Sequence, residues 1–195
     1  MKSQFPVLTA TLLVLVAIAF ALQNFFDLSS FAFTPAYAFS RPWTFVTAIF
    51  LHANIIHIFF NSFALLIFGT FLEARISKAA FVLIFFLGGV LGNIGYMLTS
   101  TDAFTPAIGA SGAIYGIMGA VAILAPTATV FVYGIPMPMI LALLVWGALE
   151  VFGVFIPQGN IASIAHVFGL VSGVLFALYM RNGYNRKAKL LFEDS

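Results

Sequence analysis

The sequence predicts an all-α membrane protein that forms one domain over residues 1–195 and crosses the bilayer six times. Of its 195 residues, 63% are hydrophobic and only 7% are charged, whereas about a quarter of the residues in a soluble domain carry charge. The apolar residues fall into six uncharged runs, and a transmembrane helix needs about 20 such residues. Six spans leave only short connections, which excludes a cytosolic enzyme and a separate soluble domain.

Two counts exclude further classes of function. The sequence contains no cysteine, which excludes disulfides, thiolate metal sites and a cysteine nucleophile. The net charge of +2 is small and scattered along the chain, whereas nucleic-acid binding needs a clustered basic face. We therefore expect the lipid bilayer as a partner and no nucleic acid.

The six predicted spans follow one another closely. Their approximate bounds are residues 5–22, 50–72, 79–98, 109–125, 138–155 and 161–180. The first run is long for a signal peptide and no clear cleavage stretch follows it, so we expect it to be a span. The longest connection, residues 23–43, is rich in aromatic side chains. Because so many aromatics do not suit a solvated loop, we expect an amphipathic outer loop in the membrane interface.

The basic residues predict the orientation of the chain. Seven of the eight Lys and Arg residues lie on one side of the predicted topology, namely Lys2, Arg75, Lys78, Arg181, Arg186, Lys187 and Lys189. Arg41 alone lies on the other side. Because Lys and Arg accumulate on the cytoplasmic side of membrane proteins, we expect both termini in the cytoplasm. The localisation that we expect is a prokaryotic cell membrane.

Ser111 lies at the start of the fourth predicted span, between Gly109 and Gly112. The turn at Thr105-Pro106 precedes it, which predicts a helix N-terminus at this point. There, unpaired N–H groups and the helix dipole can stabilise a developing oxyanion, and the glycines let a substrate backbone approach closely. The alternative is that Ser111 only caps the helix and the glycines only permit helix packing.

His166 lies near the start of the sixth predicted span, at the same expected depth as Ser111, because both spans begin at the outer face. Glycines spaced by four on both spans would let the two helices touch: Gly112 with Gly116, and Gly169 with Gly173. A neutral imidazole could then accept the serine proton and return it to a leaving amine. The alternative is a histidine that only makes a hydrogen bond between helices.

Three further polar or aromatic side chains could contribute to the same site. Tyr115 follows Ser111 by four residues, so it could pack against the imidazole or simply fill the core. His57 and Asn61 are also four apart and place two hydrogen-bond donors on one helix face, which suits an oxyanion hole. The alternative for this pair is interhelical hydrogen bonding. We expect His52 to be structural and nearer to the surface.

The chain resembles the rhomboid family of intramembrane serine proteases over nearly its whole length. Four features carry the resemblance by their order and spacing: Arg41-Pro42-Trp43, the pattern of His52, His57 and Asn61, the run from Gly109 to Gly116 around Ser111, and His166 with Gly169 and Gly173. Glu73 also fits the family pattern. Phe168 departs from it, since a glycine is more usual there, which leaves the helix packing around the histidine less certain.

The resemblance implies a six-helix core and a Ser111–His166 catalytic dyad without a third acidic residue. It implies an oxyanion hole formed by His57, Asn61 and the backbone N–H of Ser111, with Tyr115 stacked on His166. The expected substrates are single-pass membrane proteins, cut in their transmembrane segment near the outer face. The resemblance also implies a substrate gate at the fifth span and the connection over residues 156–161.

Two acidic residues receive no catalytic role. We assign no role to Glu150 in the fifth span, and Asp102 lies in an outer loop, where we do not expect it to orient a base. Glu150 also has no histidine at helical spacing, which argues against a metal site. No metal-binding motif occurs, so we expect neither a metal nor a cofactor. Two other functions stay open: a pseudoprotease that binds membrane helices without cutting them, and a small transporter that uses the histidines as a proton relay.

Overall fold

Apolar helices make up most of the structure, a computed structural model that describes residues 5–132, 134–155 and 163–193, with side chains as far as Arg181. Within these residues the apolar helices are α1 (Val7–Gln23), α3 (Ile55–Ala64) continued by a π-helical segment (Leu65–Gly69) and α4 (Thr70–Glu73), α5 (Lys78–Thr99), α6 (Ser111–Leu124), α7 (Met139–Phe155) and α8 (Ser163–Glu193). The predicted helical membrane fold is confirmed.

Three stretches of these helices are long and apolar enough to cross a membrane: Ile55–Glu73, Lys78–Thr99 and Ser163–Arg181. The others are shorter, with 17 residues in α1, 14 in α6 and 17 in α7. The six-span topology stays a prediction.

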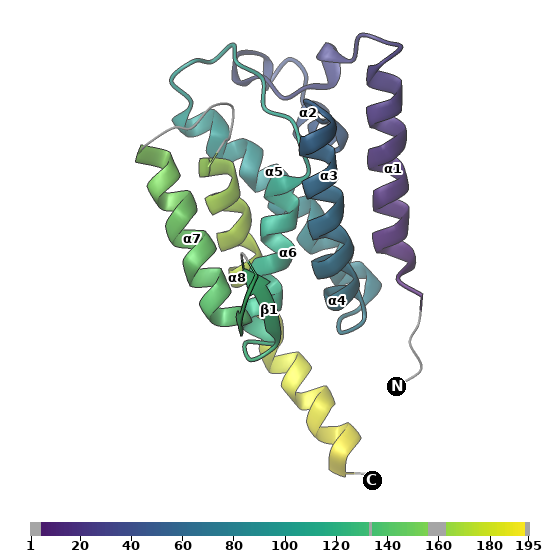
Figure 1. Cartoon of the computed structure of the whole chain (residues 1–195), viewed down its shortest axis with the longest axis vertical. Coiled ribbons are helices and arrows are strands. Elements are labelled where there is room, and N and C mark those ends of the chain that lie inside the picture. The colour runs from purple at the N-terminus through teal and green to yellow at the C-terminus, as the bar shows by residue number, and fades with distance from the viewer. Residues whose placement is uncertain (1–4, 133, 156–162, 194–195) are drawn as a thin grey trace.

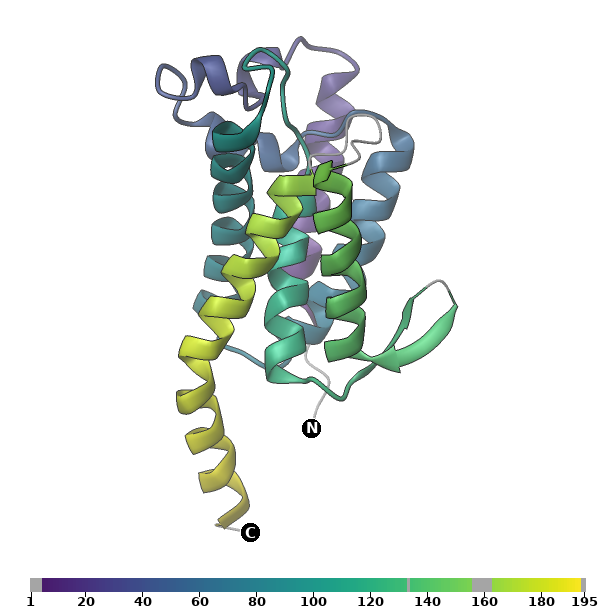
Figure 2. The ribbon, with the colours of Figure 1, turned by 90° about the vertical axis from the view of Figure 1, so that its left-hand side faces the viewer.

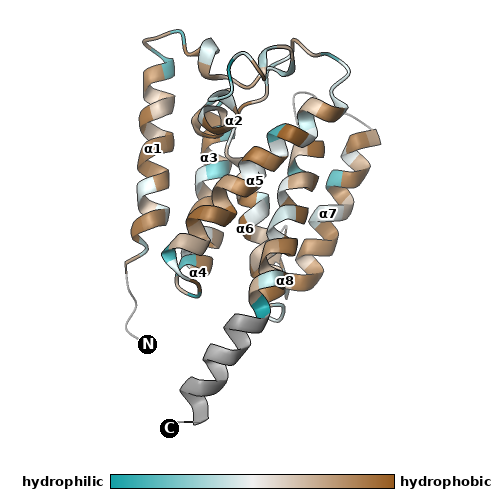
Figure 3. Cartoon of the chain, turned by 180° about the vertical axis from the view of Figure 1, so that it is seen from behind, coloured by the Kyte–Doolittle hydropathy of each residue, from teal (hydrophilic) through white to brown (hydrophobic). Residues whose placement is uncertain are grey.

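The described chain begins and ends at the same end of the bundle (Figure 1). The segments that join α1 to α3 and α5 to α6 lie at the opposite end, which we call the outer end. The last turns of α8 extend beyond the other helices (Figure 2). Apolar residues predominate along the helices (Figure 3). The cytoplasmic position of the termini stays a prediction.

A small β-hairpin between α6 and α7 is not part of the sequence-based expectation. Its strands are β1 (Thr129–Val132) and β2 (Ile135–Pro138), which pair antiparallel. The β1 segment consists of β-branched and aromatic residues, which favour strands, and Gly134 in the turn has a φ of +83°. The hairpin lies toward the end where the chain begins and ends (Figure 2).

The helix expected over residues 50–72 begins later in the structure. The short helix α2 (Thr44–Thr47) and a 3-10 turn (Ala48–Phe50) precede it, and α3 starts at Ile55. Asn54 caps α3, because its side-chain oxygen accepts a hydrogen bond of 2.9 Å from the N–H of His57. An asparagine in this position satisfies one of the free N–H groups of the first turn. His57 therefore lies in the first turn of α3, near the outer end.

The outer loop over residues 23–43 folds onto the end of the bundle through two 3-10 turns, Ser29–Phe31 and Pro35–Tyr37. Phe33 is fully buried there, its ring lies 4.6 Å from that of Phe45, and its backbone pairs with Ala107. The exposed aromatic side chains of the loop are Phe25, Phe26, Phe31, Tyr37, Phe39 and Trp43. The interfacial location predicted for this loop stays a prediction.

The helix α6 lies at the centre of the bundle and packs against α5 and α8. A Cβ atom added to Gly169 would lie 2.1 Å from the carbonyl oxygen of Gly112, and one added to Gly173 would lie 1.8 Å from that of Gly116. The backbones of α6 and α8 are therefore in direct contact, and the contact predicted from the paired glycines is confirmed.

The helix α6 is short and begins inside the bundle (Figure 1). At 1.5 Å per residue, α6 is about 21 Å long, whereas the hydrocarbon core of a bilayer is about 30 Å thick. The loop after α5 enters the bundle and α6 begins below the level of the outer loops (Figure 1). The sequence thus places Ser111, the first residue of α6, inside the bundle and not at its outer surface.

Glu73 at the end of α4 binds the start of α1. Its carboxylate accepts hydrogen bonds of 2.8 Å from the N–H groups of Leu8 and Thr9 and from the Thr9 hydroxyl. A negative charge at a helix N-terminus is favourable, because the free N–H groups and the helix dipole are positive there. These contacts hold α1 against the rest of the bundle.

Candidate active site

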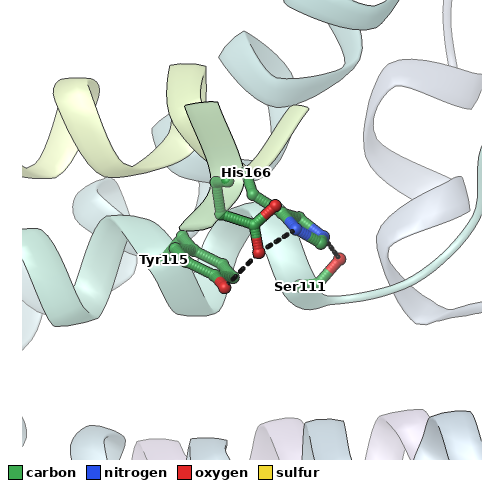
Figure 4. A network of polar contacts seen from close by, with 4 residues as sticks. Ser111, Tyr115 and His166 are labelled. Atoms are coloured by element: carbon green, nitrogen blue, oxygen red, sulfur yellow. Dashed lines mark hydrogen bonds and ion pairs between the residues drawn. The ribbon is translucent and has the colours of Figure 1, made fainter. Parts of the chain in front are cut away.

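Ser111 and His166 meet where the first turns of α6 and α8 cross (Figure 4). The Oγ atom of Ser111 lies 2.8 Å from Nε2 of His166. This distance lets the hydroxyl donate to an unprotonated Nε2, which is the arrangement of a nucleophile and its base. The glycine contact between the two helices brings these side chains together, although they are 55 positions apart.

Tyr115 lies one turn after Ser111 and stacks on the imidazole of His166. The two rings have centroids 4.6 Å apart and planes that differ by 9°. The stack fixes the plane of the imidazole and shields one of its faces. The sequence left open whether Tyr115 packs against the imidazole or only fills the core, and the structure shows that it packs against His166.

Glu150 of α7 lies next to the other nitrogen of the imidazole. Its Oε1 atom is 3.0 Å from Nδ1 of His166, and both side chains are mostly buried, with 13% and 12% of their surface exposed. The Tyr115 hydroxyl donates a hydrogen bond to the same oxygen (Figure 4). Oε1 is out of line with an N–H on Nδ1, and Nδ1 makes no well-aligned hydrogen bond within the described residues. The contact is therefore a close electrostatic one.

The position of Glu150 bears on two expectations. No role could be assigned to this residue from the sequence, whereas the structure places it beside a histidine of α8. The family resemblance implied no third acidic residue beside the dyad, whereas the structure places a carboxylate in contact with His166. A polar residue isolated in an apolar span was the available signal, since such a residue needs a partner in the membrane.

His57 and Asn61 of α3 lie beside the segment that leads into α6. A Cβ atom on Gly109 would be 2.7 Å from Cε1 and 2.8 Å from Nε2 of His57, and 3.9 Å from Nδ2 of Asn61. Gly109 also has a φ of +128°, which L-residues with a side chain rarely adopt. We expected Gly109 to let a substrate backbone approach, and the structure shows that its lack of a side chain makes room for His57.

His52 lies beside the segment that leads into α6. It is buried (1% exposed), whereas we expected it nearer to the surface. Its Nδ1 is 3.2 Å from the carbonyl oxygen of Phe50, its Nε2 is 3.5 Å from the backbone nitrogen of Ala110, and its ring centroid is 5.0 Å from that of His57. A proton on Nδ1 would let Nε2 accept from Ala110 at this long distance. The side-chain amide of Gln23 donates to the carbonyl oxygen of His52 and accepts from its N–H. His52 thus supports the segment that enters α6.

Residues 40–183 match the family model of the Rhomboid domain. The chain belongs to the rhomboid family. Its membership and its apolar helices make it an integral membrane protein. The match includes α2 to α7 and the start of α8, and therefore every residue of the candidate site.

Named rhomboid proteins share a similar degree of identity with this chain. "Putative rhomboid protease YdcA" of Bacillus subtilis (strain 168) is 34% identical over 135 residues, which cover 69% of this chain and 65% of that protein. "Rhomboid protease GluP" of the same strain is 32% identical over 136 residues, covering 69% and 25%. "Rhomboid protease GlpG" of Yersinia pseudotuberculosis is 28% identical over 140 residues, covering 70% and 48%. The chain thus spans less than two thirds of the length of each relative.

Phe168, the departure from the family pattern, packs on α5. A Cβ atom added to Gly95 would lie 2.5 Å from Cγ of the Phe168 ring, so the aromatic side chain occupies the space that Gly95 leaves open. The large residue on α8 is accommodated by a missing side chain on the facing helix. The close packing of this rhomboid around His166 is therefore kept.

Asp102 remains in the outer loop, as expected. Its two carboxylate oxygens accept hydrogen bonds from the N–H of Phe104 at 2.9 Å and the hydroxyl of Thr105 at 2.6 Å. These bonds hold the pKa of the Asp102 carboxyl below its usual value. The residue closes a turn and stays ionised at neutral pH.

Two other expectations concern a gate and a metal. The gate expected at α7 falls partly on residues 156–161, which lie outside the described residues. In the part of the chain that the structure describes, no group of three or more His, Asp or Glu side chains is arranged to hold a metal ion.

Proposed function

We propose that this rhomboid is a serine endopeptidase that cuts membrane proteins within the bilayer, with Ser111 as nucleophile and His166 as general base and acid. The observation that carries the proposal is the 2.8 Å contact between Oγ and Nε2 at the N-terminus of α6. The names of the relatives, which include rhomboid proteases of two bacterial genera, support the same activity.

The reaction is acyl transfer in two halves. Nε2 of His166 takes the proton of Ser111 while Oγ bonds to the carbonyl carbon of the scissile peptide. When the C–N bond breaks, His166 gives this proton to the leaving amine, and the acyl group remains on Oγ as an ester. A water molecule then attacks the ester as its proton passes to His166, and Oγ recovers a proton as the ester breaks.

The oxyanion of each tetrahedral intermediate would be bound by three donors. The backbone N–H of Ser111 belongs to the first turn of α6 and so has no partner within the helix. Asn61 donates one hydrogen of its amide to the carbonyl oxygen of His57 at 3.0 Å, which leaves the second hydrogen for the oxyanion. The imidazole of His57, packed on Gly109, supplies the third donor. A donor in such a site contributes about a hundredfold to a thousandfold in rate.

The substrates that we propose are single-pass membrane proteins, cut in their transmembrane segment near the outer face. A carbonyl group in a helix is shielded by its own hydrogen bond, so the segment has to unwind before Oγ can attack. The beginning of α6 inside the bundle supports a cleavage point below the membrane surface (Figure 1). We also propose that both termini face the cytoplasm of a prokaryotic cell, as the distribution of Lys and Arg indicates.

The test uses the full chain purified in detergent, with two readouts. A fluorescent fluorophosphonate reagent should label the protein covalently, and a designed single-pass substrate with small residues and a helix-breaking residue near its outer end should be cut. Ser111→Ala should abolish both signals. Ser40→Ala, a control in the exposed outer loop, should retain both. Full proteolysis by Ser111→Ala would refute the assignment.

A further inference from the structure

We propose that Glu150 of α7 is a positioning residue for His166, so that the catalytic serine and histidine of this protein are supported by a third, acidic residue. The inference rests on the proposed function above. It goes beyond the two-residue arrangement, because it gives a role to a carboxylate that the family pattern does not require.

Glu150 is the one charged residue among the 17 residues of α7. A carboxylate in a membrane helix is unfavourable unless it is paired or faces a polar site. The partners of this one include His166 and Ser163 on α8 and Tyr115 on α6. Its contacts with His166 and Tyr115 therefore join it to the candidate active site.

The geometry places the imidazole between a hydroxyl and a carboxylate. Oγ of Ser111 is 2.8 Å from Nε2, and Oε1 of Glu150 is 3.0 Å from Nδ1. The two contacts use the two different nitrogens of one ring (Figure 4). The Tyr115 hydroxyl donates to Oε1, so the carboxylate is itself held in place by α6, the helix that carries Ser111.

A carboxylate beside Nδ1 would have two effects on the reaction. It favours the neutral tautomer with the proton on Nδ1, which leaves Nε2 free to accept the proton of Ser111. It also stabilises the imidazolium that forms when Nε2 takes this proton. Because Oε1 is out of line with the N–H direction, the effect should be smaller than that of a well-aligned acidic residue in a catalytic triad.

The other groups around His166 do not supply this charge. Ser111 and Tyr115 face it from α6 and His57 faces it from α3, and none of these is an anion at neutral pH. The helix α5 also packs on α8 and carries Lys78 at its start and Tyr96, whose hydroxyl binds the carbonyl oxygen of Thr105. Among the described residues, the negative charge that faces the imidazole is that of Glu150.

A structural role alone would have different consequences. If Glu150 only held α7 against α6 and α8, its removal would lower the stability of the protein and would change the rate by the same factor at every pH. If it positions the imidazole and stabilises its charged form, its removal would also change the pH at which activity is lost. The pH profile therefore separates the two roles.

The main experiment compares the wild type with Glu150→Gln, which keeps the size of the side chain and removes its charge. The rate of inactivation by the fluorophosphonate and kcat/KM for the designed substrate are measured between about pH 5 and 9. We expect both rates at the plateau to fall about tenfold to a hundredfold. We also expect the acidic limb of the profile to move to lower pH, because the negative charge beside Nδ1 is removed.

Two variants complete the comparison. Asp102→Asn removes a carboxylate from the outer loop, away from His166, and should keep the rate and the pH profile of the wild type. Glu150→Asp keeps the charge but withdraws it by one methylene group, so kcat should fall while the acidic limb stays nearer to that of the wild type. If Glu150→Gln does not fold, Glu150→Asp carries the test, and an unchanged kcat in that variant would overturn the inference.

The outcomes distinguish this inference from the proposed function. A Glu150→Gln protein with the rate and profile of the wild type overturns the positioning role and leaves the protease assignment intact. A lowered rate with an unmoved acidic limb also overturns it and assigns Glu150 to structure. A wild-type protein that neither reacts with the fluorophosphonate nor cuts the substrate overturns both proposals.

Discussion

Tyr115 contacts His166 and Glu150 with different parts of one side chain. Its ring stacks on the imidazole with centroids 4.6 Å apart, and its hydroxyl donates to the carboxylate that lies against Nδ1. The imidazole is thus limited in plane by the ring and in rotation by the groups at its two nitrogens. This arrangement couples α6, α7 and α8 at the point where the proton transfer would take place.

The two contacts of Tyr115 can be separated by mutation. Tyr115→Phe removes the hydrogen bond to Glu150 and keeps the stack, so we expect kcat to fall about threefold to tenfold, in line with about 0.5–1.5 kcal/mol for one hydrogen bond. Tyr115→Ala removes both contacts and should lower kcat further, by about another tenfold. Steady-state cleavage of the designed substrate measures both. Equal rates for the two variants would show that the ring does not orient His166.

Gly109 should be intolerant of a side chain for two reasons. Its φ is +128°, and a Cβ atom would lie 2.7 Å from Cε1 of His57. Gly109→Ala should therefore displace His57 or the start of α6, and we expect a loss of at least tenfold in kcat/KM.

A matched control separates displacement from backbone strain. Gly134→Ala changes a glycine with a φ of +83° in the β-hairpin, where nothing lies within 4 Å of the added Cβ. Both variants carry strain of about 1–3 kcal/mol, so both should unfold at lower temperature. The Gly134→Ala protein should keep its kcat/KM at 25 °C. A similar loss of activity in the two would mean that strain, and not the contact with His57, affects the site.

The contact between α6 and α8 should be equally sensitive. Gly169→Ala places a methyl group 2.1 Å from the carbonyl oxygen of Gly112, so the helices must separate, which increases the distance between Ser111 and His166. We expect fluorophosphonate labelling to fall more than tenfold, with a lower melting temperature, because overpacking destabilises a core by about 1–3 kcal/mol. Gly147→Ala on α7 is the control, since its nearest neighbour would be 3.9 Å away. Normal labelling of Gly169→Ala would contradict this account.

The structural features that could be predicted from the sequence are those indicated by the spacing of residues along a single helix. Glycines four residues apart on α6 and on α8 indicated the crossing, and the structure shows that crossing. Ser111 and His166 come together because each lies in the first turn of one of these two helices. The pattern is visible in the sequence because residues four apart share a helix face.

The features that the sequence did not predict depend on how helices are rotated against one another. Apart from Glu150, the residues of α7 are apolar on all sides, so no polar stripe shows which face meets the bundle. Glu150 therefore indicated that a partner exists, but not that the partner is His166. A structural role was expected for His52, but its partners, Ala110 and Gln23, were not, because they lie far away along the chain. The β-hairpin was missed because its strands are only four residues long.

A substitution of Glu73 should change the stability of the fold without changing the rate of catalysis. Its carboxylate accepts three hydrogen bonds at the start of α1, and it makes none of the contacts that define the candidate site. Glu73→Gln weakens these bonds and removes the charge from the helix N-terminus, so we expect the free energy of unfolding to fall by about 1–3 kcal/mol. The kcat at 25 °C should stay at the wild-type value.

The measurement for Glu73 combines thermal unfolding in detergent with cleavage of the designed substrate. Thr11→Ala is the control on the same helix, because the Thr11 hydroxyl is exposed and bonds only to the carbonyl oxygen of Val7 within α1, and its melting temperature should match the wild type. The Glu73→Gln protein should melt earlier and cut the substrate normally, since α1 holds neither Ser111 nor His166. A lower kcat at an unchanged melting temperature would instead mean that the position of α1 controls the site.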